Sequence, residues 1–327
     1  MRDVISVVLS SYNGEKFIAE QLESILNQTL KPDEVIICDD CSKDSTPDIV
    51  RSFIEKNNLK NWSFTVNEQN VGYCLNFYNG IQRAKGDIIF LSDQDDVWEK
   101  EKVSTMVSVM NNNPDIYSLA SRYSVIDQFG KEIIDPPITY LGDTFDDSIE
   151  QVSIDSLIGC SYIRGFSMCI RQEIKPYLKP IDLKSMLSHD WYINMLAAML
   201  SKSCILNTKL CRYRYHHSNT SLSVLDRKTL IGSTDTRKSG LKESITAHEY
   251  LLSLNKVTRA EEKALKKQIA CEKSRLKFLE TKNIFRWIGL VRFIGSYKRY
   301  YKSFKGAIRI FIGDLLYAYK INFKVKK

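Results

Sequence analysis

The first hundred residues alternate between short uninterrupted hydrophobic runs and longer segments in which hydrophobic residues recur at helical spacing. Largely apolar runs, typical of buried strands, lie at residues 5–9, 34–38 and 87–91, and a further strand is predicted near residues 62–66. The amphipathic segments between them predict helices at about residues 17–26, 46–54 and 73–84. Buried strands joined by amphipathic helices are typical of an α/β domain whose mostly parallel sheet carries helices on both faces.

The rest of the chain has a different pattern. A helix is predicted from residue 98 to about Met110, and further strands with a long loop at 135–147 follow between residues 116 and 175. Another helix is predicted from Asp190. A polar segment and a charged helical pattern over 241–280 come next. We therefore predict a first domain over 1–220, a linker over 221–240 and a helical region over 241–327.

Composition indicates a folded globular protein, with 43% hydrophobic and 26% charged residues. The net charge of +8 is concentrated at the C-terminus. Residues 281–327 hold 12 of the 47 Lys and Arg residues and only one of the 39 Asp and Glu residues. The remainder of the chain is therefore mildly acidic, and the basic character belongs to the tail.

The eight cysteines and the N-terminus predict a cytoplasmic protein with reduced thiols. The first hydrophobic run is too short for a signal peptide, and no run of 18 apolar residues predicts a membrane-spanning helix. Cys38 and Cys41 form a C-x-x-C motif. Because no second such pair follows, the motif favours neither a zinc site nor a redox pair.

Acidic residues follow two of the predicted strands. Asp39 and Asp40 end the second strand, and Asp93, Asp95 and Asp96 in LSDQDDVW end the fourth. Ligands of open α/β sheets bind beyond the carboxyl ends of the strands, so we expect both clusters to lie at one edge. Closely spaced carboxylates repel one another unless a cation or protons are bound. Oxygen ligands at this spacing suit Mg²⁺ or Mn²⁺.

The acidic cluster also has other interpretations. An ordinary acidic turn is one, with Asp96 capping the next helix. The sequence DQDDV also mimics an aspartate-nucleophile phosphatase motif, but those enzymes carry it on their first strand. The chain contains no G-x-G dinucleotide fingerprint and no G-x-x-x-x-G-K-[ST] phosphate loop.

Three segments in this order resemble the family 2 glycosyltransferases of the GT-A fold over roughly residues 3–220. They are SVVLSSYNGEKFIAEQLESILNQT, IICDDCSKDST and NVGYCLNFYNGIQRAKGDIIFLSDQDDVW. LSDQDDVW, HDWY and YRYHHSN further resemble bacterial rhamnosyltransferase-type enzymes that build surface polysaccharides. The resemblance implies a GT-A domain, Rossmann-like, followed here by the helical C-terminal region.

The resemblance also implies roles for particular residues. The nucleotide and donor site would comprise Ser10, Tyr12, Asp40 and Asp93. The divalent metal, Mn²⁺ or Mg²⁺, would be bound by Asp95, with His216 of YRYHHSN close to it and to the diphosphate. Asp190 of HDWY would be the catalytic base. Cys41 departs from the family pattern, which commonly has Gly at this position. Because Cys is more restricted in φ than Gly, this departure predicts a differently shaped turn.

These roles fit the chemistry of glycosyl transfer. A divalent ion neutralises charge on a departing diphosphate, and a sugar hydroxyl needs a base to take its proton. One base and one metal-assisted leaving group imply a single displacement with inversion. The implied donor is a dTDP- or UDP-sugar, plausibly carrying rhamnose, and the implied acceptor is a lipid-linked saccharide. The alternatives are another sugar donor, such as a UDP-sugar, and an inactive carbohydrate- or nucleotide-binding scaffold.

Each site residue also has a structural alternative. Asp190 also suits the N-cap of the helix that follows it, although the resemblance favours the role of base. His216 has the alternative of being an ordinary surface histidine. For Trp98 and Trp191, packing in the core is favoured over a role as sugar platforms.

The basic tail contains 11 of the 35 aromatic residues. Lysines and arginines recur at helical spacing beside an apolar stripe, which consists of Tyr297, Tyr301, Phe304, Ile308, Phe311 and Ile312. Such a helix suits an anionic membrane surface, which we favour over packing on the catalytic domain. Single-stranded nucleic acid is the least favoured partner, and we predict none. The predicted location is therefore peripheral, at the inner face of the cell membrane.

Overall fold

The computed structural model describes residues 2–133, 145–159, 162–180, 188–216, 219, 234–301 and 304–319. Most of the predicted loop at 135–147 and most of the predicted linker lie outside these residues. The described chain divides into two compact units. The first unit comprises residues 1–152, 162–181 and 193–217, and the second comprises 153–161, 182–192 and 218–327.

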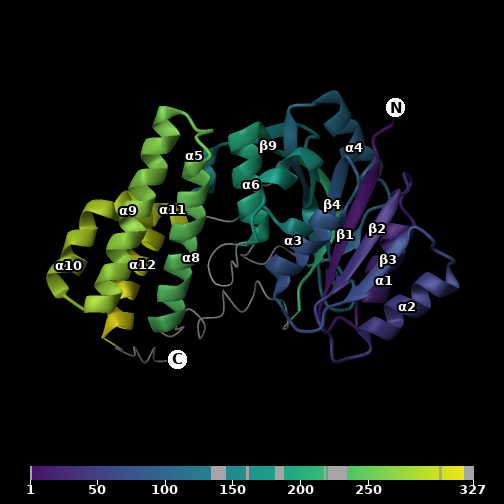
Figure 1. Cartoon of the computed structure of the whole chain (residues 1–327), viewed down its shortest axis with the longest axis horizontal. Coiled ribbons are helices and arrows are strands. Elements are labelled where there is room, and N and C mark those ends of the chain that lie inside the picture. Colours follow the sequence, from purple (N-terminus) through teal and green to yellow (C-terminus); the bar gives the residue numbers. More distant parts are fainter. Residues whose placement is uncertain are drawn as a thin grey trace. The chain divides into compact units, whose positions relative to one another are not determined.

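The first unit is built on one sheet flanked by helices (Figure 1). Its parallel part has the order β3-β2-β1-β4, with strands β1 (Ile5–Ser11), β2 (Glu34–Asp39), β3 (Trp62–Val66) and β4 (Ile88–Asp93). The connecting helices are α1 (Ile18–Leu26), α2 (Thr46–Lys56) and α3 (Tyr73–Arg83). The alternation predicted from the hydrophobic pattern is confirmed.

The sheet continues beyond β4 in mixed orientation. β8 (Met168–Arg171) pairs antiparallel with both β4 and β6 (Ile116–Ile126), and β9 (Lys202–Arg214) runs parallel to β6. The short strands β5 (Val97–Trp98) and β7 (Ile149–Val152) pair antiparallel with β9. The sheet is therefore parallel from β3 to β4 and mixed elsewhere.

The core of the first unit lies between the sheet and its helices. β1 is buried along its whole length, and so is most of β4. Such uninterrupted burial explains their continuous apolar sequences. α4 (Lys102–Asn112) packs on β6, and α6 (His189–Leu200) precedes β9. The short 3-10 turn η1 (Gly165–Ser167) supplies Phe166 to the same core.

The second unit is helical in its described part (Figure 1). Its main helices are α8 (Thr234–Ser253), α9 (Arg259–Thr281), α10 (Ile284–Gly289), α11 (Ile294–Tyr301) and α12 (Phe304–Ala318), with α5 (Ile154–Leu157) and the 3-10 turn η3 (Leu290–Phe293). Two predictions are corrected here. α8 begins at Thr234, inside the predicted linker, and the helical pattern over 241–280 forms two helices. Asn255, with a φ of +52°, lies in the turn between them.

The predicted amphipathic stripe of the tail is corrected in part. Tyr297 is fully buried, and its ring packs against that of Phe311, with 5.8 Å between centroids. Phe311 also stacks on Trp287 at 4.5 Å. These residues belong to a hydrophobic core of the helical unit itself. Among the described helices, none is long and apolar enough to cross a membrane.

Candidate active site

The carboxyl ends of β1, β2 and β4 lie side by side. β1 is the central strand of the three, with Ser10 opposite Asp93 of β4 and Ser11 opposite Asp39 of β2. Ser11 Oγ donates a hydrogen bond of 2.8 Å to Asp39 Oδ2. The prediction that both acidic clusters lie at one edge of the sheet is therefore confirmed.

Asp40 organises the loop that follows β3. It is 2% exposed, and its carboxylate accepts hydrogen bonds from the backbone N–H groups of Val71 and Gly72, each at 2.8 Å. Asn67 Nδ2 donates to the same carboxylate at 3.0 Å. Gly72 has a φ of +85°, a conformation that favours glycine. Asp40 therefore fixes the shape of the loop over residues 67–72 at the predicted nucleotide edge.

Ser10 is held in place by Asn76, which the sequence analysis did not identify. Asn76 Nδ2 donates to Ser10 Oγ and to the backbone oxygen of Cys38, both at 2.7 Å. Asn76 is fully buried in α3. Tyr12, by contrast, is 46% exposed and presents its ring to solvent beyond the end of β1. A buried Asn on an otherwise apolar helix face was the available signal.

Gln94 is the middle residue of Asp93-Gln94-Asp95, the D-x-D turn, and joins this turn to the segment after β1. Tyr12 N donates to Gln94 Oε1 at 2.8 Å, and Gln94 Nε2 donates to the Tyr12 backbone oxygen at 2.9 Å. A Cβ at Gly14 would lie 2.1 Å from Gln94 Oε1. Glycine at position 14 therefore leaves the space that Gln94 occupies. No role for Gln94 was predicted from the sequence.

Asp95 and His216 form the pair predicted for the metal. His216 Nε2 lies 2.9 Å from Asp95 Oδ2, and the two side chains are 9% and 17% exposed. A carboxylate suits both Mn²⁺ and Mg²⁺, whereas an imidazole favours Mn²⁺ over Mg²⁺. The described residues contain no cluster of three or more metal-binding side chains. The pair fits an ion whose remaining ligands are water and phosphate oxygens.

Asp96 does not cap the next helix, because α4 begins only at Lys102. Asp96 is instead fully buried, and its Oδ1 accepts a hydrogen bond of 2.9 Å from the backbone N–H of Arg214. Burial, with Asp95 and Asp93 close by, raises the pKa of Asp96 well above its usual range.

Asp190 belongs to the second unit. It is the second residue of α6 and is 6% exposed. Its Oδ1 accepts hydrogen bonds from Trp191 N at 2.7 Å and from Ser188 Oγ. Asp190 thus lies within the first turn of α6 rather than at the N-cap.

The two tryptophans of the site motifs are packing residues, as favoured by the sequence analysis. Trp98 is 3% exposed and belongs to the core of the first unit. Trp191 is 1% exposed, and its indole N–H donates to the backbone oxygen of Leu157 at 2.8 Å. Neither ring is available to stack on a sugar.

Cys41 adopts a φ of +66°, in the region that glycine occupies without strain. Cys41 therefore has the left-handed conformation that glycine favours, although its residue type departs from the family pattern. All seven cysteines in the described residues are free thiols. Burial raises the pKa of Cys169 to about 12 and that of Cys211 to about 11.

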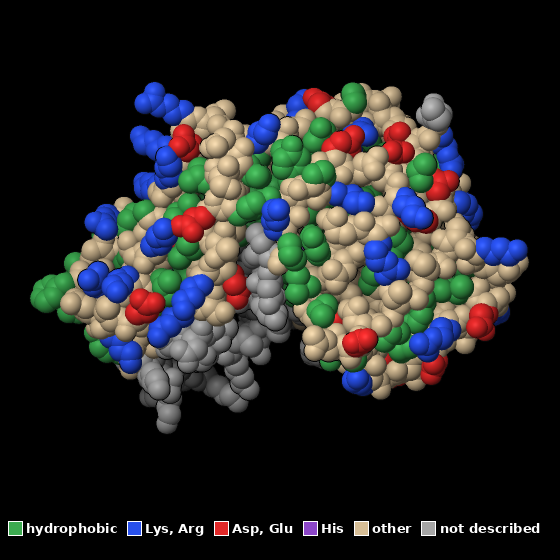
Figure 2. Space-filling model, viewed as in Figure 1, with side chains coloured by type: hydrophobic (Ala, Val, Ile, Leu, Met, Phe, Trp, Pro, Cys, Tyr) green, Lys and Arg blue, Asp and Glu red, His purple; other side chains and the backbone are tan. Residues whose placement is uncertain are grey.

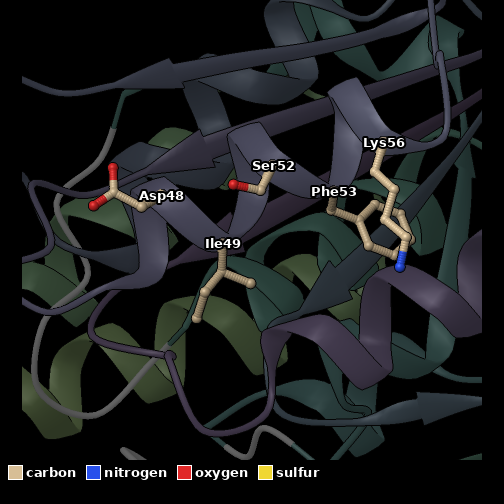
Figure 3. Close-up of a pocket in the computed structure, with 5 residues that line it drawn as sticks. All are labelled: Asp48, Ile49, Ser52, Phe53 and Lys56. Carbon is tan, nitrogen blue, oxygen red and sulfur yellow. The ribbon is translucent and has the colours of Figure 1, made fainter.

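A shallow pocket on the surface of the first unit is unrelated to these residues (Figure 3). Its lining comes entirely from α2 and consists of Asp48, Ile49, Ser52, Phe53 and Lys56. It contains neither the D-x-D turn nor the strand ends, so it is not the candidate active site.

Comparisons with known proteins agree with the fold. Residues 6–167 match the model of Glycosyl transferase family 2. The chain is 28% identical over 162 residues to the putative teichuronic acid biosynthesis glycosyltransferase TuaG of Bacillus subtilis, which covers 49% of this chain and 60% of TuaG.

Two solved structures share the fold. S. aureus TarS 1–349 in complex with UDP-GlcNAc matches with a TM-score of 0.61 and 17% identity, covering 97% of this chain and 89% of that one. The mannosyltransferase PcManGT of Pyrobaculum calidifontis, in complex with GDP-Man and Mn²⁺, matches with a TM-score of 0.53 and 16% identity. That match covers 100% of this chain and 89% of the mannosyltransferase.

Proposed function

Because this protein is a glycosyltransferase that carries a family 2 domain on a GT-A fold, we propose that it transfers a sugar from a nucleotide donor in one metal-dependent, inverting displacement. One observation carries this proposal. The Asp95–His216 pair stands directly beyond the end of β4, next to the strand ends that hold Ser10 and Asp40. Such an arrangement suits a diphosphate whose nucleoside lies along the neighbouring strand ends.

The residues of this edge have separate tasks in the proposal. Ser10, Tyr12 and Asp40 receive the base and ribose, and Asp93 receives the ribose. Asp95 and His216 hold the divalent ion, which supplies Lewis-acid neutralisation of the departing diphosphate. Gln94 keeps the nucleoside segment and the metal-binding turn in register through its two hydrogen bonds to Tyr12.

Asp190 is the proposed base. Its Oδ1 already accepts hydrogen bonds from Trp191 N and Ser188 Oγ, which orient the carboxylate at the start of α6. An oriented carboxylate can take the proton from an acceptor hydroxyl as that hydroxyl attacks the sugar. Attack from the side opposite the diphosphate inverts the anomeric centre without a covalent intermediate.

The proposed donor is a dTDP- or UDP-sugar, plausibly rhamnose, and the proposed acceptor is a lipid-linked polysaccharide intermediate. The likeness to TuaG supports polysaccharide synthesis as the setting. The alternative donor is a UDP-sugar that carries a sugar other than rhamnose. The fold that the chain shares with TarS, solved in complex with UDP-GlcNAc, supports this alternative.

A panel experiment tests this proposal. The purified protein is incubated with dTDP-, UDP- and GDP-sugars in the presence of Mn²⁺ or Mg²⁺, and released nucleotide is measured. We expect release from at least one donor, and EDTA should abolish it. Absence of release from every donor, with and without lipid-linked acceptors, would contradict the proposal.

The proposed membrane contact is a surface of the helical unit that we call the apolar face. It consists of the exposed side chains of Ile284, Phe285, Ile288, Val291, Phe304, Ile308 and Ile312. They lie on α10, η3 and α12, and α10 packs on α12, since Trp287 Nε1 donates to the Phe311 backbone oxygen at 3.0 Å. This face replaces the stripe predicted from the sequence, whose Tyr297 lies in the core.

Basic side chains accompany the apolar face. Exposed lysines and arginines of the same segments include Lys282, Arg286, Arg292, Lys305 and Arg309. Figure 2 shows Lys and Arg side chains, in blue, spread over the visible surface of the helical unit among hydrophobic ones. Apolar residues flanked by cations suit an anionic membrane surface. We place the protein at the inner face of the cell membrane on this ground.

Co-sedimentation with phosphatidylglycerol-containing vesicles tests the membrane contact. The wild type should bind at low salt and release at high salt, and Phe285→Glu combined with Ile288→Glu should abolish binding. Phe129→Glu is the matched control, because Phe129 is 84% exposed but lies in the first unit. Failure of the wild type to bind, or equal binding of both variants, would overturn the proposed contact.

A further inference from the structure

Arg214 is an arginine whose side chain is buried beside the candidate metal pair. It is the last residue of β9 and is 1% exposed, among the largest fully buried side chains of the protein. A guanidinium cannot lose its proton, so its burial requires compensating partners. Where those partners lie determines what Arg214 does.

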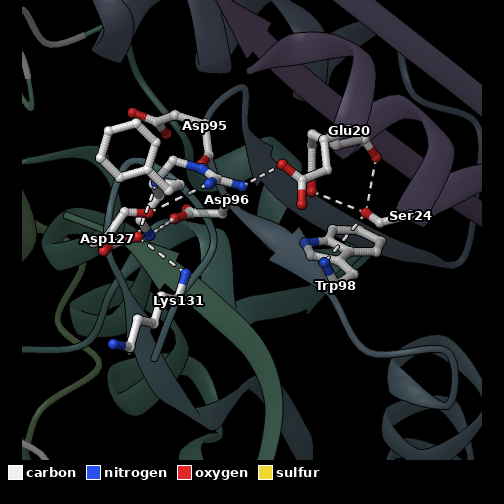
Figure 4. Close-up of polar contacts among 10 residues, drawn as sticks. Glu20, Ser24, Asp95, Asp96, Trp98, Asp127 and Lys131 are labelled. Atoms are coloured by element: carbon white, nitrogen blue, oxygen red, sulfur yellow. Dashed lines mark hydrogen bonds and ion pairs between the residues drawn. The ribbon is translucent and has the colours of Figure 1, made fainter. Parts of the chain in front are cut away.

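The guanidinium holds three separate segments together. Its Nε donates to the Asp95 backbone oxygen at 2.9 Å, and its Nη1 donates to the Asp127 backbone oxygen at 3.4 Å. Its Nη2 forms an ion pair with Glu20 of α1. Figure 4 shows Glu20, Asp95 and Asp127 gathered at this point. The D-x-D turn, α1 and the end of β6 are thereby joined through one side chain.

The backbone of Arg214 fastens the same turn. Its N–H donates to Asp96 Oδ1 at 2.9 Å, so both the main chain and the side chain of Arg214 hold residues 95 and 96. The turn that presents Asp95 is consequently fixed through the Asp95 backbone oxygen and the Asp96 carboxylate, and not through the Asp95 side chain.

A stack of side chains extends from Arg214 to His216. The Arg214 Cζ lies 5.0 Å from the centre of the Phe17 ring, a cation–π contact. The Phe17 ring in turn lies 4.8 Å from the His216 ring, inclined at 39°. Because His216 Nε2 is 2.9 Å from Asp95 Oδ2, the contacts close a circuit from Arg214 through Phe17 and His216 to Asp95 and back.

We propose that Arg214 is a positioning residue that sets the geometry of Asp95 and His216 for the divalent ion. The inference rests on the proposed function, because it takes this pair to be the metal-binding pair. Arg214 fixes the Asp95 main chain by hydrogen bonds and supports the His216 ring through Phe17. Arginine is required because its planar fork serves several acceptors at once and stacks on an aromatic ring.

Two variants test this role without removing a metal ligand. Arg214→Lys keeps the positive charge but loses the fork and the planar stack. Phe17→Leu removes the ring between Arg214 and His216 while leaving every hydrogen bond of the guanidinium in place. Arg212→Lys is the matched control. Arg212 lies on the same strand, but its guanidinium pairs with Glu99 at 2.7 and 3.1 Å and is 46% exposed.

Two measurements are made on each folded variant. Mn²⁺ binding is followed by electron paramagnetic resonance with UDP, dTDP or GDP present, and amide hydrogen exchange is followed over residues 94–97. We expect Arg214→Lys and Phe17→Leu to weaken Mn²⁺ binding about tenfold, the typical cost of losing an outer-shell partner of a metal ligand. Arg214→Lys should also speed exchange in the turn, and Arg212→Lys should change neither quantity.

The outcomes separate this inference from the proposed function. If the wild type binds Mn²⁺ and both variants bind it as tightly, the positioning role is wrong and the proposed function stands. If the wild type binds no Mn²⁺ with any nucleotide, the metal-dependent function fails, and the inference fails with it. If Arg214→Lys unfolds, Phe17→Leu alone decides, because it removes no hydrogen-bond or ion-pair partner from the buried guanidinium.

Discussion

The two units of this protein each bury a cluster of charged groups, but only the cluster of the first unit extends to a partly exposed side chain. In the first unit, buried Arg214 and Asp96 lead to Asp95, whose side chain is 17% exposed. In the helical unit, Asp314 is fully buried and its partners close around it. A buried charge therefore does not mark a functional site by itself.

The negative charge of Asp314 is compensated by two arginines and a tyrosine hydroxyl. Asp314 accepts hydrogen bonds from Arg275 Nε at 2.7 Å, Arg237 Nη1 at 2.8 Å and the Tyr297 hydroxyl at 2.8 Å. Burial alone would raise the pKa of Asp314, but Arg275, Arg237 and Tyr297 lower it below its usual value. We infer that this cluster fixes how α8, α9, α11 and α12 pack, whereas the Asp95 cluster presents ligands.

The largest effect is expected on turnover. Asp190→Asn should lower the rate of sugar transfer by about 10²–10⁴-fold, the usual contribution of a positioned general base. The melting temperature should change little, because Asn retains an acceptor for Trp191 N. Rates are measured with the donor identified in the panel. Near-normal turnover of the folded variant would show that the base is another residue.

The next effect is expected on stability in the other unit. Asp314→Asn removes the charge that compensates buried Arg275 and should cost about 3–5 kcal/mol of unfolding free energy. Urea unfolding followed by circular dichroism measures it. Glu262→Gln, which removes the exposed ion pair with Lys266, is the control and should leave the midpoint unchanged. Equal midpoints for the two variants would break the comparison between the clusters.

A smaller effect is expected where Gln94 joins the two loops of the active site. Gln94→Ala and Gly14→Ala should each weaken nucleotide binding by about tenfold, or roughly 1.4 kcal/mol. Because the Gly14 variant displaces Gln94, the double variant should be no weaker than either single one. Calorimetric titration with the donor nucleotide measures this. Full additivity would mean that the two positions act independently.

The smallest effect is expected at Cys41. Cys41→Gly should raise the free energy of unfolding by about 0.5–1 kcal/mol, because glycine adopts the φ of +66° without steric cost. Nucleotide binding should be unchanged. A loss of stability would show that the left-handed turn is not the source of strain.

The parallel half of the sheet could be predicted because burial on both faces leaves an uninterrupted apolar sequence. β1, β2 and β4 follow that rule, whereas the edge strand β3 has no fully buried residue. β6 and β9 are long strands whose pairing has register shifts, and β8 runs antiparallel between β4 and β6. No local pattern encodes such pairing. The division of residues 241–280 into two helices depends on the turn at Asn255, which the charged pattern does not reveal.

The candidate site was predictable only where its residues form a motif. Asp93, Asp95 and His216 were identified from their segments, and Asp95 and His216 indeed lie together. Asn76, Gln94 and the connections of Arg214 were missed, because each depends on a partner far away in the chain. Arg214 and Glu20 are 194 positions apart, and neither segment alone indicates the contact.

The central claim is that Asp95 and His216 hold the ion on which sugar transfer depends. Its most direct test is nucleotide release by the wild type and by Asp95→Ala as Mn²⁺ is titrated after EDTA treatment. The account predicts that Mn²⁺ restores release by the wild type and leaves folded Asp95→Ala at its basal level. Release by the wild type that EDTA does not reduce, or full activity of Asp95→Ala, would contradict it.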